Sequence, residues 1–221
     1  MRTIGLLGGS FDPLHTAHLA MADAFAVALR LDEIRFVPAS QPWQKHGLFA
    51  SGEEREAMLE AALAHHRAPH GHYVIDTREL RRAGKTYTIA TLEELRREVG
   101  AAVSLIFLFG ADQLVHLDTW KDWRRLWDHA HLAAATRPGF DVLSMSAEVA
   151  REWSSRLGDV EALHTRPSGR SYLLDDFAHD VSATDIRATL GAGDASAIAA
   201  LSRLVPSAVL DYIRANHLYR S

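Results

Sequence analysis

Cysteine does not occur among the 221 residues of the chain. Its absence excludes a disulfide framework, thiolate metal sites, iron–sulfur clusters and a cysteine nucleophile. Long apolar runs are also missing: none approaches the ~18 residues of a membrane-spanning helix. The N-terminal stretch MRTIGLLGGSFDP lacks the length and the small-residue cleavage site of a signal peptide. These absences predict a cytoplasmic protein without a transmembrane segment.

A basic excess is lacking as well, because 24 Lys and Arg stand against 28 Asp and Glu, for a net charge of −4. A nucleic-acid coat or a binder of anionic membranes normally carries the opposite sign, so we expect neither partner. Apolar residues make up 48% and charged residues 24%, which is ordinary globular composition. We expect a single domain over residues 1–221, with a helical C-terminal portion from about residue 182.

Short apolar runs alternate with longer amphipathic segments along the chain. Strands are predicted at Thr3–Leu7, Glu33–Pro38, Tyr73–Asp76, Val103–Phe109, Leu132–Thr136 and Tyr172–Leu174. Helices are predicted at Ala17–Leu29, Ser51–His65, Thr88–Glu98, Trp120–His129, Ser146–Arg156, Thr184–Leu190 and Pro206–Asn216, whereas the segment Pro138–Arg170 is otherwise rich in loops. This alternation predicts a Rossmann-like, doubly wound α/β fold: a mostly parallel sheet with helices on both faces. Ligands of such folds bind beyond the carboxyl ends of the strands.

The strongest local motif is GGSFDPLHTAHL, Gly8–Leu19, which follows the first strand and enters a helix. Gly8 and Gly9 allow a ligand to approach the backbone. His15 and His18 are three residues apart and lie on one helix face, where backbone N–H groups attract phosphate. Two imidazoles there are suited to a polyphosphate. The same H-x-x-H spacing also suits a metal pair or two surface histidines.

A second motif, VSATDIRATL at Val181–Leu190, opens a late helix. Ser182 or Thr184 can cap it, and Arg187 lies one turn in, within reach of an anion bound at the same helix start. Taken alone, it also fits an ordinary capped helix with a solvated arginine. The pairs Arg81–Arg82 and Arg96–Arg97 are expected on solvated faces. The histidines of one loop fit no tetrahedral metal pattern: His65, His66, His70 and His72.

Together the two motifs resemble the signature of nucleotidylyltransferases with the H-x-G-H motif, G-[ST]-F-D-P-x-H-x-G-H near the N-terminus and [IV]-S-x-T-x-I-R near the C-terminus. Within that superfamily the chain is most similar to bacterial nicotinate-nucleotide adenylyltransferases, which act in NAD biosynthesis. The stretches that support this resemblance are Val37–Gly47, Lys85–Arg96, Phe109–Leu126, Thr136–Gly139 and Val205–Tyr219, whereas Phe140–Arg170 matches no stretch of the family pattern. Three positions depart from the family pattern: Ala17 in place of Gly, Gln44 in place of His and Ala183 in place of a hydroxyl residue.

The resemblance implies that nicotinate mononucleotide and ATP react to give deamido-NAD and pyrophosphate. It implies catalytic roles on the ATP phosphates for His15, His18 and Arg187. The ATP-binding residues it implies are Gly8, Gly9, Ser10, Phe11, Gly110, Asp112, Ser182 and Thr184. The mononucleotide-binding residues it implies are Asp12, Lys45, Thr86, Tyr87, Thr88, Trp120, Lys121 and Arg137. Mg²⁺ is expected on the substrate phosphates and water, without a metal site made by the protein.

Other interpretations stay open from the sequence. The acceptor could be nicotinamide mononucleotide or the substrate of another sibling transferase, or the chain could be a non-catalytic nucleotide sensor. Among single residues, Asp112 also fits a helix cap and Lys45 a solvated loop lysine. Trp120 could pack in the core, as Trp123 and Trp127 are expected to do from their helical spacing.

Overall fold

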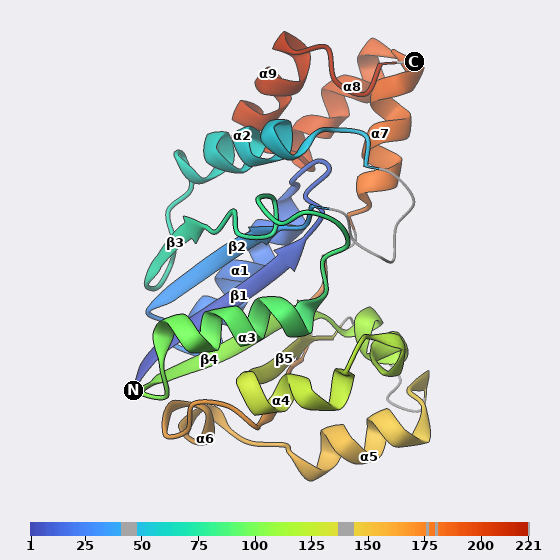
Figure 1. Ribbon diagram of the computed structural model, residues 1–221. Coiled ribbons are helices and arrows are strands. Elements are labelled where there is room, and N and C mark those ends of the chain that lie inside the picture. The colour runs from blue at the N-terminus through green and yellow to red at the C-terminus, as the bar shows by residue number, and fades with distance from the viewer. Residues whose placement is uncertain (41–47, 137–143, 176, 180, 221) are drawn as a thin grey trace.

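The computed structural model describes residues 1–40, 48–136, 144–175, 177–179 and 181–220. The described strands form one six-stranded sheet in which every pairing is parallel (Figure 1). They are β1 Arg2–Gly9, β2 Glu33–Pro38, β3 His72–Ile75, β4 Val103–Gly110, β5 His131–Ala135 and β6 Ser171–Leu174. This confirms the predicted strands to within a few residues at each end.

Helices connect the strands and close the chain. The α-helices are α1 Thr16–Ala28, α2 Gly52–Leu63, α3 Thr88–Val99, α4 Leu126–His129, α5 Ala147–Ser155, α6 Val160–His164, α7 Ala183–Ala192, α8 Ala195–Ala200 and α9 Ser207–Ala215. The 3-10 helices are η1 Ala111–Thr119, η2 Trp123–Arg125 and η4 Leu201–Arg203. None of the described helices is both long enough and apolar enough to cross a membrane.

The strand order β3-β2-β1-β4-β5-β6 makes β1 and β4 neighbours at the centre of the sheet. From β1 the chain winds outward to β3, then returns across β1 to β4 and winds outward in the other direction. The helices that follow β1 and β4 therefore leave a crevice between the carboxyl ends of these two strands, where ligands of doubly wound folds bind. Gly9 ends β1 and Gly110 ends β4, so both sides of this crevice begin with a glycine.

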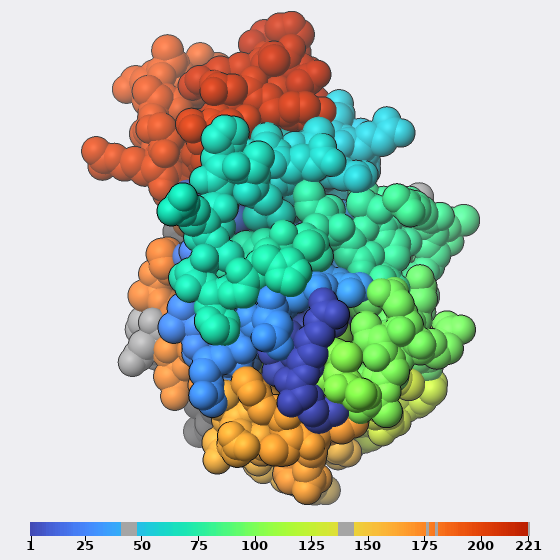
Figure 2. Space-filling view, turned by 90° about the vertical axis from the view of Figure 1, so that its left-hand side faces the viewer, coloured from blue at the N-terminus to red at the C-terminus, as the bar shows by residue number. Residues whose placement is uncertain are grey.

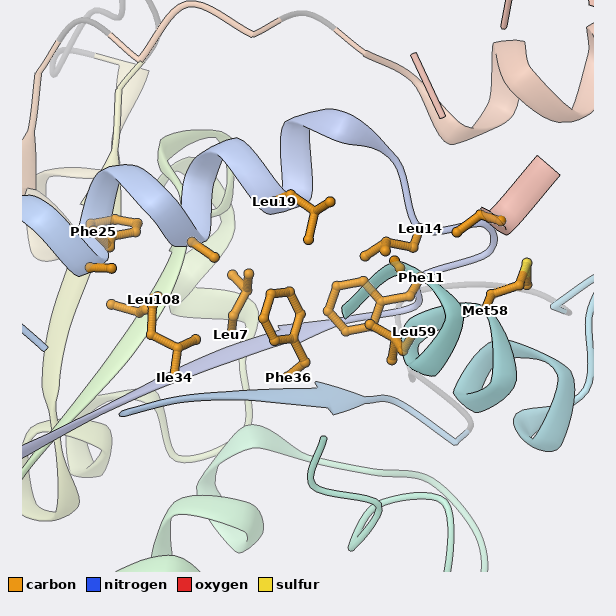
Figure 3. Packing of buried hydrophobic residues seen from close by; sticks show 14 of the residues in the cluster. Leu7, Phe11, Leu14, Leu19, Phe25, Ile34, Phe36, Met58, Leu59 and Leu108 are labelled. Atoms are coloured by element: carbon orange, nitrogen blue, oxygen red, sulfur yellow. The ribbon is translucent and has the colours of Figure 1, made fainter. Parts of the chain in front are cut away.

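Two hydrophobic cores cover the two faces of the sheet, because successive strand residues point to opposite faces. On β1, Leu7 belongs to one core and Leu6 to the other. Figure 3 shows Leu7 and Phe36 directed toward Leu19 of α1 and Leu59 of α2. Residues of α7 and α9 complete this first core, whereas α3, η1, α4 and α5 cover the opposite face. Helices on both faces confirm the predicted doubly wound fold.

Local capping signals account for several helix starts. Ser51 Oγ accepts a hydrogen bond from the N–H of Glu54 (3.2 Å), and Glu54 Oε2 accepts from the N–H of Ser51 (2.7 Å), which is a complete capping box for α2. Ser146 caps α5 and Ser182 caps α7 through their hydroxyls. These contacts lie within three residues of each other along the chain, and the sequence predicts them for that reason.

The predicted helix Trp120–His129 is wrong in its first half. Trp120 follows η1, Asp122 adopts a left-handed backbone (φ 50°), and helical structure resumes only at Trp123. A left-handed residue interrupts a right-handed helix, although Trp123 and Trp127 are buried as predicted. The short helices α6 and α8 were not predicted, because five or six residues are too few to show a helical period.

Arg96 also differs from its predicted place on a solvated face. Its guanidinium donates hydrogen bonds of 2.6–2.9 Å to four backbone carbonyls, those of His129, Gly100, Val103 and Pro167. Arg96 therefore ties the end of α3 to the chain around β4 and β5. The spacing of charged residues along a helix does not reveal such a set of contacts, because two of the carbonyls, those of His129 and Pro167, come from distant parts of the chain.

His131 on β5 has no exposed surface and is held in one neutral form. Its Nδ1 accepts the backbone N–H of Arg170 (2.9 Å), so Nε2 carries the proton and donates to the carbonyl of Arg166 (2.9 Å). Burial lowers the pKa of His131 to about 4. A charged imidazolium would lose the acceptor nitrogen as well as its hydration.

We predict that this histidine makes the fold sensitive to acid. The folded pKa lies below the unfolded value of about 6.5, so the contribution of neutral His131 is complete above pH 6.5 and is lost as the pH falls toward about 4. The loss should reach up to ~3 kcal/mol of unfolding free energy. Urea unfolding at several pH values should show this slope in the wild type and a flatter one in His131→Gln.

The matched control is His70→Gln, because His70 is exposed. This variant should follow the wild-type pH dependence. If the curves of His131→Gln and the wild type ran parallel between pH 6.5 and 4, the proposed role of His131 would be wrong.

Candidate active site

Two cavities meet at the carboxyl ends of β1 and β4. The larger, about 600 Å³, has a mostly polar lining, and we name it the polar cavity; its wall includes His15, His18, Asp112, Thr184 and Arg187. The smaller, about 290 Å³, has a mostly apolar lining, and we name it the apolar cavity; its wall includes Glu79, Thr86, Thr88, Phe107 and Trp120. Both are lined by Ser10, His18, Met21, Gly110 and Gln113. The two cavities are therefore adjoining compartments of one site.

His15 and His18 form a stacked pair at the start of α1. Their ring centroids are 3.7 Å apart, and His15, the N-cap residue, is only 6% exposed. The backbone N–H of His15 donates to Nδ1 of His18 (3.3 Å). When His18 is neutral, its proton is therefore on Nε2, which acts as a donor. Phe11 supports this ring from the side, edge to face at 5.0 Å.

The start of α1 is partly occupied by the chain itself. The N–H and the hydroxyl of Thr16 both donate to the carbonyl of Leu204, at 2.8 and 3.0 Å. One backbone donor that the sequence analysis assigned to phosphate is thus used by the C-terminal region. Ala17 lines the polar cavity, so the methyl group that distinguishes it from glycine lies in the cavity wall.

Arg187 is fixed by three neighbours. Its Nη1 donates to the backbone carbonyl of Asp12 (2.6 Å), and its Nη2 donates to the hydroxyl of Thr184 (3.1 Å). Its guanidinium lies 4.6 Å from the centroid of the Phe49 ring, which is a cation–π contact. A cation held from several sides is already oriented before an anion arrives, so little side-chain entropy remains to be lost on binding.

Asp12 is the buried centre of these contacts, with 2% of its surface exposed. Its Oδ2 accepts the N–H of Phe49 (2.8 Å), and its Oδ1 accepts the N–H of Ala50 (3.1 Å) and the hydroxyl of Tyr219 (2.7 Å). The carboxylate is thus engaged with the protein on both oxygens. Its predicted contact with the mononucleotide stays a prediction, and the role that the geometry supports is to hold the cavity wall.

The two sequence motifs meet in the folded chain. His15 and His18 from the first motif, and Thr184 and Arg187 from the second, line the same polar cavity. Imidazole and guanidinium donors on one cavity wall suit a polyanion with several oxygens. The cavity also carries the carboxyl group of Asp112, which is exposed on its wall.

Some of the other residues assigned to ATP line the cavities, and others support the residues that do. Gly8 and Gly9 line the apolar cavity, and Ser10 and Gly110 line both. An added Cβ at Gly9 would come within 2.9 Å of the Phe11 ring, so this position requires glycine. The ring of Phe11 is fully buried and supports His18 without lining either cavity. Ser182 uses its hydroxyl to cap α7 and is absent from both described linings.

The residues assigned to the mononucleotide gather only in part. Thr86, Thr88 and Trp120 line the apolar cavity, where Trp120 packs against Phe107 and Phe109 with 9% of its surface exposed. Within the described part of the chain, Trp120 Nε1 has no hydrogen-bond partner. Tyr87 and Lys121 contact each other through a cation–π interaction at 4.9 Å and line neither described cavity. Lys45 and Arg137 lie outside the described residues, as do the departure Gln44 and part of Phe140–Arg170.

Glu79 was not singled out by the sequence, yet its carboxyl group lines the apolar cavity. Its Oε1 accepts the hydroxyl of Thr91 (2.6 Å), and Arg82 donates to that same hydroxyl (3.0 Å) and pairs with Glu94 (2.6 Å). Burial raises the pKa of Glu79 above its ordinary value, and the Thr91 hydrogen bond opposes the shift. The sequence carries no local signal for Glu79, because its partners come from the following helix.

The polar cavity also contains residues that the sequence analysis missed. They are Met21, Leu48, Phe49, Ala111, Gln113, Ala135, Phe177, His179 and Val181. Phe49 is 73% exposed, which is unusual for a large apolar side chain, and its backbone is held by Asp12. A run of aromatic and small residues before a helix does not by itself indicate a cavity wall.

Comparison with known proteins identifies the class first. Residues 6–189, which include the first motif and all but the last residue of the second, match the family model described as cytidylyltransferase-like. The fold agrees: the nicotinic acid mononucleotide adenylyltransferase of Plasmodium falciparum, in complex with NaAD, aligns with a TM-score of 0.74 at 18% identity, over 99% of this chain and 98% of that one.

Relatives of known sequence narrow the class. A protein of Herminiimonas arsenicoxydans is 47% identical over 100% of this chain and 98% of its own length, and one of Chromobacterium violaceum is 43% identical over 98% of each. Both are named as probable nicotinate-nucleotide adenylyltransferases. The chain belongs to the nicotinate-nucleotide adenylyltransferase family.

Glu79 yields a prediction about stability. Because its folded pKa is raised, its proton is released later in the folded than in the unfolded protein, so ionisation should destabilise the fold as the pH rises above about 4.5. As the pH rises from 4.5 to 8, the unfolding free energy of the wild type should therefore fall relative to that of Glu79→Gln. Denaturant unfolding at fixed ionic strength measures this difference.

Glu98→Gln is the matched control with the opposite sign. Hydrogen bonds from Arg78 and Arg35 lower the pKa of Glu98, so its contribution is present above pH 4.5 and is lost as the pH falls through its folded pKa. The effect should be small, because this side chain is half exposed. If Glu79→Gln and Glu98→Gln changed the pH dependence of stability in the same direction, the opposite pKa shifts given to Glu79 and Glu98 would be wrong.

Proposed function

We propose that the protein joins ATP and nicotinate mononucleotide to give deamido-NAD and pyrophosphate. The observation that carries this proposal is the convergence of His15, His18 and Arg187 on one polar cavity that adjoins a mostly apolar one. A nucleotide transfer needs both, one compartment for phosphates and one for a flat base. The names of the full-length relatives support the same reaction, as does the NaAD bound to the Plasmodium protein.

The reaction needs donors more than it needs a base. An oxygen of the mononucleotide 5′-phosphate attacks the α-phosphorus of ATP in line, a new P–O bond forms, and the bond to the β-phosphate oxygen breaks to release pyrophosphate. A phosphate monoester dianion is already a nucleophile at neutral pH, so no side chain has to remove a proton. Catalysis then depends on holding two anions together and stabilising the charge that develops on oxygen.

The side chains of the polar cavity match these needs. His18 donates from Nε2 and His15 from its ring to oxygens of the α- and β-phosphates. Arg187 holds the β- and γ-phosphates, with Thr184 beside it, and Ser182 keeps the start of α7 in place. The turns at Gly8–Ser10 and Gly110 bring backbone close to the adenosine, and Asp112 faces the ribose or a water on the phosphates.

The apolar cavity suits the pyridine ring. Trp120 offers an aromatic surface, and Thr86 and Thr88 stand at the start of α3, where backbone N–H groups favour a carboxylate. Tyr87 and Lys121 lie next to these residues in the chain and join the site as its outer support. Asp12 holds the cavity wall, and Lys45 and Arg137 are assigned to the mononucleotide by their motif alone.

Magnesium is expected with ATP, and the donor set fits an ion held by the substrate. Within the described part of the chain, no group of three His, Asp or Glu residues could hold a metal. The carboxyl groups on the polar cavity wall are those of Asp12 and Asp112, and Asp12 is engaged on both oxygens. The substrate phosphates and water would therefore bind the ion, with Asp112 facing its water. Such an ion neutralises phosphate charge.

A second acceptor, nicotinamide mononucleotide, is favoured by one observation. A carboxylate on the pyridine ring needs only hydrogen-bond donors around it, whereas an amide also needs a hydrogen-bond acceptor. The carboxyl group of Glu79 in the apolar cavity can accept such a hydrogen bond. However, Glu79 Oε1 already accepts a hydrogen bond from the Thr91 hydroxyl (2.6 Å), which weakens the case for the amide substrate.

The acid and amide substrates can be compared directly. We expect pyrophosphate release with ATP, Mg²⁺ and nicotinate mononucleotide, and a kcat/KM at least ~10-fold lower with nicotinamide mononucleotide, which corresponds to ~1.4 kcal/mol. A coupled pyrophosphate assay with each mononucleotide measures both. Turnover with the amide alone would show that the proposed acceptor is wrong, and no turnover with either would contradict the whole proposal.

Replacing one phosphate donor tests the mechanism. His18→Ala should lower kcat by roughly 10²–10³-fold, as the loss of one oxyanion donor does elsewhere, and should leave the melting temperature nearly unchanged. The control is His70→Ala, which removes an exposed histidine that is absent from both described cavity linings. Equal turnover of the two variants would rule out the role given to His18.

A further inference from the structure

The C-terminal residues return to the active site and contact it from behind. Figures 1 and 2 show the C-terminal helices seated on α2, and residues of both belong to one hydrophobic core. Beyond α9, Leu218 bonds back to the carbonyl of Ile213 (3.0 Å), and His217 and Tyr219 adopt left-handed backbones (φ 53° and 61°). Such a conformation is unfavourable for residues other than glycine, and the local hydrogen bond of Leu218 together with tertiary contacts holds this turn. Leu218 and Tyr219 pack against the core, and the Tyr219 hydroxyl lies 4.0 Å from Met58 Sδ and donates a 2.7 Å hydrogen bond to Asp12 Oδ1.

We infer that Tyr219 is a positioning residue for the transfer reaction: by donating to Asp12, it sets the place of Arg187 in the polar cavity. This inference rests on the proposed function, in which Arg187 holds the ATP phosphates. Tyr219 itself is absent from both described cavity linings, so it acts through another residue.

Two routes lead from Asp12 to Arg187. The backbone carbonyl of Asp12 accepts Nη1 of Arg187 (2.6 Å), so any shift of this backbone moves the guanidinium. The carboxylate of Asp12 also accepts the N–H of Phe49, and the Phe49 ring lies under the same guanidinium (4.6 Å). Both the hydrogen bond and the cation–π contact of Arg187 thus depend on where Asp12 lies.

The Tyr219 hydroxyl is the side-chain donor that the described residues offer to the Asp12 carboxylate, and its other two donors are backbone N–H groups. Arg55, another buried polar side chain nearby, donates its Nη1 to the carbonyl of Ser10 (2.8 Å), two residues before Asp12, and its Nε has no hydrogen-bond partner among the described residues. Burial, together with the hydrogen bond to Asp12, raises the pKa of Tyr219, so the phenol stays protonated and donates. Without this donor, the N–H of Ala50 is the one hydrogen bond that the described residues leave to Oδ1 of the buried carboxylate, and the group should move toward water.

Tyr219→Phe removes only the hydroxyl, and Tyr212→Phe is its control. Tyr212 lies on α9 and packs against the same core. We expect Tyr219→Phe to lower kcat ~10-fold and to weaken ATP binding ~5-fold, because small misplacements of a phosphate-holding group are costly. The KM for nicotinate mononucleotide should stay within about twofold, which a general loss of structure would not predict. Tyr212→Phe should match the wild type in all three quantities.

A double-mutant cycle with Arg187→Ala separates positioning through Arg187 from any other effect. If Tyr219 acts through Arg187, adding Tyr219→Phe to Arg187→Ala should change kcat and ATP affinity by less than about twofold. A full ~10-fold loss in that background would overturn the inference, and so would a Tyr219→Phe enzyme equal to the wild type at a temperature where both are folded.

The failure of this inference can be told from the failure of the proposed function. If the wild type were active and the Tyr219→Phe variant were equally active, the proposed function would be supported and the inference about Tyr219 would be wrong. If the wild type did not turn over nicotinate mononucleotide, titration calorimetry with ATP alone would still decide. Weaker ATP binding by Tyr219→Phe than by Tyr212→Phe would support positioning, and equal binding would overturn it.

Discussion

One buried carboxylate joins the parts of the chain that make up the polar cavity. Asp12 receives donors from the segment before α2 and from the C-terminus, and its carbonyl receives Arg187 from α7. A charge that is withdrawn from water is stable only when its oxygens are fully hydrogen-bonded. Meeting this condition holds the contributing segments in a single arrangement. The rigid placement of the cavity wall follows from the need to satisfy Asp12.

The topology of the parallel sheet is the second feature on which the site depends. Because the chain reverses its winding direction between β1 and β4, the crevice beyond these strands is open to a ligand, and two compartments form there. His18 lines both, at the boundary between them. Under the proposed function, this imidazole lies between the compartment for the phosphates and the compartment for the pyridine ring.

Charged side chains also organise the apolar compartment from outside. Arg78 pairs with Asp76, Glu94 and Glu98, and Arg82 continues the series to Thr91 and so to Glu79. This network runs from the surface near β3 to the cavity wall along α3. Its outer pairs are exposed and weak one by one, but they share partners and so hold the start of α3, with Thr86 and Thr88, beside Trp120.

The sequence by itself determined the elements, several helix caps and the two motifs, because these depend on residues close together in the chain. The period of the apolar runs predicts six strands, the Ser51–Glu54 pair predicts a capping box, and the spacing of His15 and His18 puts both rings on one face. Resemblance to a known family added the expectation that Arg187 would join them.

Only the tertiary structure decided which groups are fixed and by what. The Tyr219 hydroxyl and Asp12 are 207 residues apart, and no local pattern links them. The same holds for the occupied N–H of Thr16 and for the burial of Glu79 in a cavity wall. Such contacts form between elements that the fold brings together, so their energies depend on distance in space and leave no period or spacing in the sequence.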